Sequence, residues 1–164
     1  MNKISKKLKS SKGFSLVELV IVIGIIAILV AVVGAFIIRF IEKSKIQKDV
    51  ANGTALAAAA TAAANEPEIY REMMHSIGGG GSLTAEIKPG MDWGASYANH
   101  MGIFLTTVGR NYGPMPDFEY KKDNPTDWVV HLTPVNERLE VTVYIKSASG
   151  TFQVAPKPEG PYAK

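Results

Sequence analysis

The chain has 164 residues, 46% of them hydrophobic, and a formal net charge of +3. Five lysines and no acid lie in residues 1–13, so the formal net charge of the remaining residues is 3 − 5 = −2. This charge does not indicate a nucleic-acid-binding protein, apart from a weak local patch. The chain has no cysteine, which excludes thiol catalysis, thiolate metal sites and disulfides.

A long apolar segment follows this basic N-terminus. Residues 19–38 are uncharged and come directly after Glu18, and as a helix they would be about 30 Å long, which is the thickness of a bilayer's hydrocarbon core. The lysines before the segment favour a cytoplasmic N-terminus and an external C-terminal part, although basic residues also outnumber acidic ones over residues 39–49. The sequence therefore predicts one membrane-spanning helix with an acid at its entrance.

The residues ahead of this helix have a specific order: Lys12, Gly13 and Phe14, then Glu18 four residues after the phenylalanine. This order resembles the leader and helix start of type IV prepilins and of the related pseudopilins of type II secretion, over residues 12–48. The resemblance implies that a membrane-embedded prepilin peptidase cuts after Gly13 and methylates the new amine of Phe14. It also implies a structural subunit, held in membrane lipid before it joins copies of itself or other pilins on a membrane assembly platform.

Cleavage would create a cationic amine on Phe14, about one helical turn from the Glu18 carboxylate. Within one chain, Glu18 also lies near the positive end of the helix dipole. In a filament we expect Glu18 of an incoming subunit to pair with the Phe14 amine of its neighbour, because a shielded ion pair that loses one partner is strongly destabilised. Glu18 is therefore the predicted assembly residue.

Other interpretations of the N-terminus stay open. An ordinary secretory signal would have a shorter apolar region, and residues 33–35 loosely fit its cleavage site, but residues 36–38 continue the apolar run. An uncut signal anchor would make the chain a membrane-anchored binding or sensor domain. Within the pilin-like interpretation, the alternatives to a main pilus subunit are a minor pilin and a pseudopilin of a secretion or DNA-uptake machine.

Small residues recur along the apolar helix at Gly24, Ala27, Ala31 and either Gly34 or Ala35. Steps of three and four place them on one face, where small side chains let helices approach closely. We expect this face to pack against other helices in a filament, although chance in a lipid-facing helix would give the same spacing.

Helical periodicity continues beyond the membrane segment. An apolar stripe is predicted at Ile46, Val50, Gly53 or Thr54, Ala57, Ala60 and Ala64. The charged and polar residues expected mostly off this stripe are Lys43, Lys45, Lys48, Asp49 and Asn52. Residues 65–67 are Asn-Glu-Pro, a stop signal. We therefore predict one helix over residues 14–64, with an amphipathic outer half.

The remaining residues predict a small head that contains a sheet. Its expected elements are a short helix or loop at 68–76, a glycine connection at 78–81, a helix within 93–109, a mainly irregular region at 111–127 with a possible strand at 118–120, and strands at 128–133, 139–146 and 151–154. Three or four antiparallel strands packed on the outer half of the long helix give an α+β fold. The pilin resemblance implies the same pilin-like arrangement.

No catalytic pattern stands out, and we expect neither an enzyme nor a metal or cofactor site. The histidines His75, His100 and His131 lack the spacing of a helical metal site. The acids Asp117, Glu119, Asp123 and Asp127 lack the EF-hand spacing and are predicted to be solvated loop acids. The aromatic residues Trp93, Tyr97, Tyr112 and Trp128 are predicted to pack in the core in preference to an adhesive surface.

The expected organisation is therefore a leader at 1–13, a transmembrane and polymerisation helix at 14–38, an amphipathic outer half at 39–65 and an extracytoplasmic head at 66–164. The expected location is the cytoplasmic membrane, crossed once with the C-terminal part outside, and then a filament at the cell surface. Such a filament would serve adhesion, motility or other surface-associated behaviour.

Overall fold

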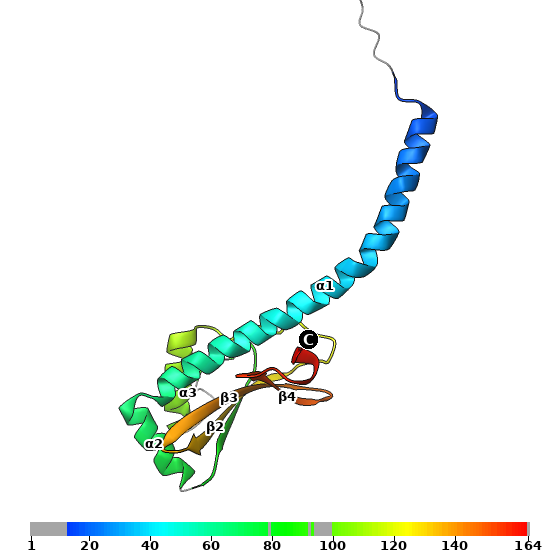
Figure 1. The fold of residues 1–164 in the computed structure, drawn as a ribbon. Helices are drawn as coiled ribbons and strands as arrows, with labels where there is room; N and C mark the ends of the chain where they lie inside the picture. The colour runs from blue at the N-terminus through cyan, green and yellow to red at the C-terminus, as the bar shows by residue number, and fades with distance from the viewer. Residues whose placement is uncertain (1–12, 79, 92, 94–99, 164) are drawn as a thin grey trace, which may run out of the picture. The chain divides into compact units, whose positions relative to one another are not determined.

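The computed structural model describes residues 13–78, 80–91, 93 and 100–163. The chain forms two compact units, Met1–Phe40 and Ile41–Lys164. Helix α1 (Leu16–Ala64) has 49 residues and contributes to both units (Figure 1). A small antiparallel sheet follows it in the chain, so the predicted α+β class is confirmed.

The apolar half of α1 is not buried inside the protein. A stretch of 18 residues in α1 has a mean hydropathy of 3.3, and none of it is buried inside the protein. By length and composition, α1 could therefore cross a membrane. Among the described residues, every large hydrophobic side chain that is strongly exposed lies between Phe14 and Ile41, apart from Ile103. This segment therefore needs lipid or other proteins to cover it.

The predicted helix stop after Ala64 is confirmed, and a second helix begins at once. Pro67 is the first residue of α2 (Pro67–Ile77), a position where proline costs no backbone hydrogen bond. At the other end, Gly78 adopts the left-handed conformation with φ 56° and its N–H donates to Met74 O at 3.3 Å. The expected short helix or loop is thus a helix closed by the first residue of the glycine connection.

The sheet has four antiparallel strands in the order β1-β2-β3-β4. Their bounds are β1 (Leu83–Ile87), β2 (Asp127–Val135), β3 (Arg138–Ser147) and β4 (Gly150–Ala155), and a short 3-10 helix, η1 (Gly160–Ala163), follows. The three strands predicted at the C-terminal end are confirmed. The fourth strand is β1, which was not predicted, whereas residues 118–120 form no strand.

The β2–β3 connection is a tight two-residue turn. Asn136 and Glu137 both have positive φ, 48° and 61°, which matches the twist of the flanking strands. Pro134 is accommodated inside β2 because it lies beyond Leu132, the last residue of β2 that pairs with β1. The two strands therefore extend further toward the turn than predicted.

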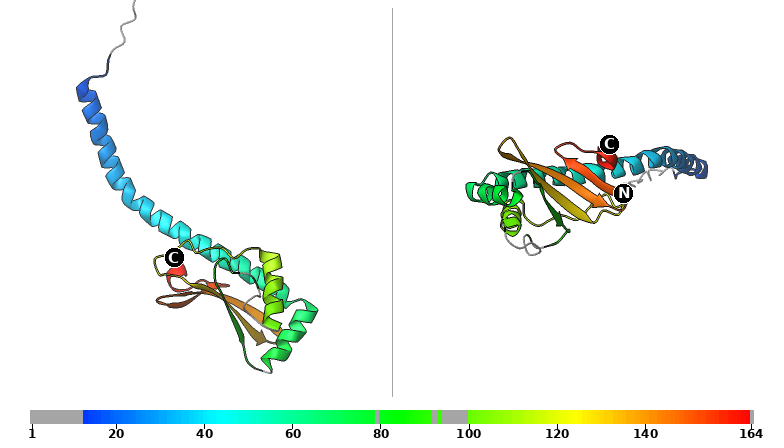
Figure 2. Two further views of the ribbon diagram at one scale, coloured as in Figure 1. Left: turned by 180° about the vertical axis from the view of Figure 1, so that it is seen from behind. Right: turned by 90° about the horizontal axis from the view of Figure 1, so that it is seen from below.

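The outer half of α1 lies across one face of the sheet (Figure 2). The closest approach is at Gly53, where an added Cβ atom would come within 2.5 Å of Val154 Cγ2 and 3.3 Å of Trp128 Cζ3. The predicted stripe is buried at Ile46, Gly53, Ala60 and Ala64, half-buried at Val50 and Ala57, and exposed at Thr54. Gly53, not Thr54, is thus the residue on the packed face, and Leu56 adds to the same core.

Asp49 corrects one sequence expectation, because it is fully buried and lies on the packed face of α1. Its Oδ1 accepts a hydrogen bond from the backbone N–H of Glu119, and its Oδ2 accepts one from that of Tyr120, both at 2.9 Å. These two bonds hold residues 118–120 against the helix and use the amides that a strand would have needed. Burial raises the pKa of the Asp49 carboxyl, although both amide bonds act to lower it.

The helix predicted within 93–109 is α3 (His100–Tyr112), which extends three residues further and ends before Gly113 with φ 91°. Residues 94–99, including Tyr97, lie outside the described residues. Trp128 is fully buried and stacks on Phe118 with ring centroids 4.8 Å apart. Trp93 and Tyr112 are half-buried against the same core. The predicted core role is therefore confirmed for these three predicted aromatic residues.

Candidate processing and assembly site

The Gly13–Phe14 peptide bond lies ahead of α1 and outside any helix. Gly13 is exposed, and the Phe14 side chain is 82% exposed. A protease needs an accessible, unwound backbone, and exposed segments beside a regular element are the usual places to find one. The geometry at this bond therefore suits cleavage without any unfolding of α1.

Ser15 caps the start of α1, a feature that the sequence interpretation missed. Its carbonyl oxygen accepts the first helical bond from the N–H of Leu19, at 3.2 Å. Its own N–H donates to Glu18 Oε2 at 3.0 Å. This is the glutamate half of a capping box. The Ser-x-x-Glu spacing ahead of an apolar run could have identified it.

Glu18 therefore has a partner in its own chain. The bond to Ser15 uses Oε2, and the structure gives Oε1 no partner among the described residues. Cleavage after Gly13 would leave both Ser15 and this bond in place and would put the new amine four residues before Glu18. A carboxylate can accept several hydrogen bonds, so the cap leaves capacity for a second donor.

The small residues of the apolar helix lie on an open face. Gly24, Ala27 and Ala31 are all exposed, and a Cβ atom added at Gly24 or Gly34 would meet nothing within 4 Å. Gly34 also lines a shallow, wholly apolar depression on α1. The side chain of Ala35 lies outside the described residues. The predicted helix-packing face is thus free to receive another helix.

The histidines and loop acids do not assemble a further site. Among the described residues, no group of three His, Cys, Asp or Glu side chains could hold a metal ion. These side chains instead make separate contacts: His100 with Glu72, His131 with Thr84, Asp117 with Lys121, Glu119 with Lys48, and Asp123 with Ser147 and Ser149. Hydrogen bonds and the charges of nearby lysines lower the pKa values of the Asp117 and Glu119 carboxyl groups, and hydrogen bonds from Ser147 and Ser149 lower the pKa of the Asp123 carboxyl group. Asp127, expected to be solvated, is buried at the start of β2.

Comparison with known proteins gives one result, at the N-terminus. Residues 8–34 match the family model of the prokaryotic N-terminal methylation motif, which is the signal motif of type IV pilins and pseudopilins. The matched range contains Gly13, Phe14 and Glu18 together with the first small residues of the helix. No curated protein and no solved structure matches the chain.

Proposed function

We propose that this chain, which carries the signal motif of type IV pilins and pseudopilins, is a structural subunit of a type IV pilus-like filament. It is cut after Gly13, methylated on Phe14 and polymerised through α1, and it has no catalytic activity of its own. The observation that carries this proposal is the motif match over residues 8–34, which includes the first part of a helix whose apolar half is not buried inside the protein. The enzyme that acts on it is a prepilin peptidase.

The exposed apolar half of α1 supports a transfer of this helix from membrane lipid into a filament of other subunits. Its side chains would be covered by membrane lipid before assembly and by the helices of neighbouring subunits afterwards. Each buried Å² of apolar surface contributes about 25 cal/mol, so a helix of this length cannot stay in water. The face with Gly24, Ala27 and Ala31 is where helices would approach most closely.

The lysines of residues 1–13 support the proposed orientation, with the head outside the cytoplasmic membrane. Basic residues after a membrane helix would oppose translocation of that flank. Five lysines precede the helix within residues 1–13 and four basic residues follow it within residues 39–49, so the larger count lies on the N-terminal side.

Glu18 offers the sharpest test, because two substitutions separate capping from pairing. In Glu18→Gln an amide oxygen can still accept the Ser15 N–H, but the charge is lost; in Glu18→Ala both are lost. If Glu18 pairs with the Phe14 amine of a neighbour, both variants are cleaved normally, and both lose filament by at least about a hundredfold, since removing one partner of a buried ion pair costs about 3–5 kcal/mol. Surface filament is measured by immunoblot after shearing, and cleavage by the mass of the cellular protein.

The matched control is Glu42→Ala, which removes an exposed glutamate from the same helix beyond its apolar half. This variant is expected to assemble like the wild type. Wild-type amounts of filament from Glu18→Gln would contradict the charge pairing and leave capping as the role of Glu18.

A second candidate is a pseudopilin, because pseudopilins carry the same signal motif. A pseudopilin would form a short piston in a secretion or DNA-uptake machine and not a long surface fibre. Electron microscopy of cells that express the chain with its own assembly genes separates the two, since only the first yields fibres that extend from the cell.

A further inference from the structure

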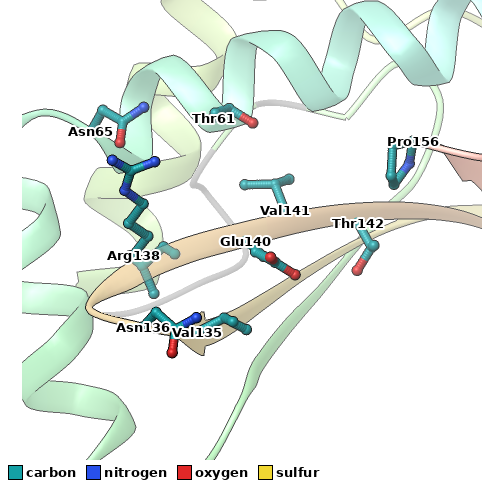
Figure 3. Close-up of a pocket in the computed structure, with 10 residues that line it drawn as sticks. Thr61, Asn65, Val135, Asn136, Arg138, Glu140, Val141, Thr142 and Pro156 are labelled. Atoms are coloured by element: carbon teal, nitrogen blue, oxygen red, sulfur yellow. The ribbon is translucent and has the colours of Figure 1, made fainter.

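A groove of about 1010 Å³ lies between the end of α1 and the start of β3. In Figure 3 Thr61 and Asn65 project from α1 toward β3, and Val141 projects from β3 toward α1. Pro156 lines the groove where β4 ends. All of these residues belong to the unit Ile41–Lys164. A groove of this volume lies at the upper end of the range of ligand-binding pockets.

The groove exists because β4 is shorter than β3. The last residue of β4, Ala155, pairs with Val143, and Pro156 follows without a backbone N–H. The first five residues of β3, 138–142, therefore pair with β2 alone. One edge of this part of β3 is open, and an open edge is a template for another strand.

The backbone groups on that edge can be assigned. The carbonyl oxygen of Lys146 accepts the N–H of Thr126 on the β2 side, and successive residues of a strand present their N–H and C=O to opposite sides. The extra residue of the β3–β4 bulge is on β4, so β3 keeps its alternation. Leu139 and Val141 therefore direct their N–H and C=O groups toward the groove. Within the described residues, no hydrogen bond from outside the sheet reaches them.

The side chains of the groove indicate what such a strand would carry. Val141 is half-buried and offers an apolar contact on the α1 side. Two charged side chains line the groove, Arg138 and Glu140. Arg138 lies at the end nearest the β2–β3 turn, is exposed and has no ion pair among the described residues, whereas Glu140 lies two residues further along β3 and disfavours a second acid there. A guanidinium group in this position suits a carboxylate, which it can bind through two hydrogen bonds.

We propose that this groove binds an extended peptide segment of another protein, which adds to β3 as an antiparallel strand and places a carboxylate on Arg138. A second copy of this chain that offered its edge strand β1 would be a poorer occupant, because Glu86, the acid on β1, is already held by Lys146 at 2.8 Å. In the antiparallel direction the carboxylate lies at the C-terminal end of the bound segment. This binding site does not depend on the filament role.

The test uses the full chain in detergent micelles and two synthetic probes. One probe is acetyl-Thr-Val-Thr-Val-Glu-amide, and the other carries Gln in place of Glu. Nitrogen-15 NMR follows the backbone amides during titration. Addition to β3 predicts that the Leu139 and Val141 amides shift and become protected from exchange. The Glu probe is expected to bind about tenfold more tightly than the Gln probe, because a hydrogen bond to a charged group is the stronger one.

Three variants make the result specific. Val141→Pro removes an edge N–H without touching the β2 ladder and should abolish binding of both probes. Arg138→Gln should make the two probes equal. Arg110→Gln removes an exposed arginine from α3, away from the groove, and should change neither affinity.

The proposal is overturned if neither probe moves the Leu139 and Val141 signals, or if Val141→Pro binds like the wild type. If Val141→Pro does not fold, the comparison of the two probes on Arg138→Gln decides alone, and an unchanged preference for Glu rejects the site. Protection of the same amides by concentration-dependent self-association, without a probe, would reject a separate partner in favour of a second copy.

Discussion

Glu18 shows how one carboxylate can serve its own helix and still be available to a neighbour. The sequence pattern identified it as the acid that needs a partner, and the structure adds the Ser15 amide as a local one. Because that bond uses a single oxygen, the cap and an ion pair with a second chain are compatible. The assembly role remains a prediction, and the two Glu18 substitutions distinguish it from capping.

Asp49 is the residue whose role periodicity should have found. It lies three residues after Ile46 and four before Gly53, which is the spacing of the packed face. Its charge placed it off the stripe in the sequence interpretation, since an acid is rarely buried without partners. The partners are backbone amides about seventy residues away in the chain, and no local pattern reveals them.

Asp49→Ala is expected to destabilise the head by about 2–3 kcal/mol, because the buried amides of Glu119 and Tyr120 lose their acceptor. Chemical denaturation of the full chain in micelles, followed by tryptophan fluorescence, measures the change in the free energy of unfolding. An unchanged unfolding midpoint would mean that the two amides find other acceptors and that the hydrogen bonds to Asp49 do not stabilise the head.

The pH dependence of Asp49 has a definite sign. Burial raises its pKa above 3.8 in the folded state, so the folded protein holds this proton more tightly than the unfolded chain. The stability of the wild type relative to Asp49→Asn should therefore fall as the pH rises from 3.8 through the raised pKa, and then stay constant. Unfolding midpoints of both proteins over a pH series test this. A difference that grows with pH would reverse the sign and contradict the burial effect.

At the scale of elements, the contact between α1 and the sheet depends on the missing side chain of Gly53. Gly53→Val would bring a Cβ atom within 2.5 Å of Val154, well inside the normal separation of two carbon atoms. We expect a loss of about 2 kcal/mol from overpacking, measured by denaturation of the full chain.

Thr54→Val is the matched control, since it places the same residue on the exposed neighbouring position of α1. It should change the stability by less than about 0.5 kcal/mol. Equal stability of the two variants would show that the helix and sheet can separate at Gly53 without cost.

The elements that the sequence predicted well are those with a strong local period. The long helix, its stop at Pro67 and the three C-terminal strands were each visible in hydrophobic spacing and turn residues. Strand β1 was missed because it is short and isolated, and its pairing with β2 joins residues more than forty apart. Residues 118–120 look like a strand, but their amides bond to Asp49 instead.

At the scale of the whole molecule, the predicted class follows from composition. Because many of the apolar residues lie in one N-terminal run, the head that follows is small. A small sheet packed on a helix is a stable way to bury the apolar residues of this head. The open edge of β3 could not be predicted, because it depends on where β4 stops relative to its neighbour. The signal motif, in contrast, was evident from the order of residues 12–18, and the family-model match over residues 8–34 confirms the motif, whereas cleavage after Gly13 stays a prediction.

The mature N-terminus of the surface protein shows whether the chain is processed as a prepilin. Protein is sheared from the surface of cells that contain a prepilin peptidase, and its intact mass and N-terminal peptide are measured by mass spectrometry. The expected result is a chain that starts at Phe14 and carries one methyl group on its amine. A surface protein that still begins at Met1, or that begins after the apolar run, would contradict it.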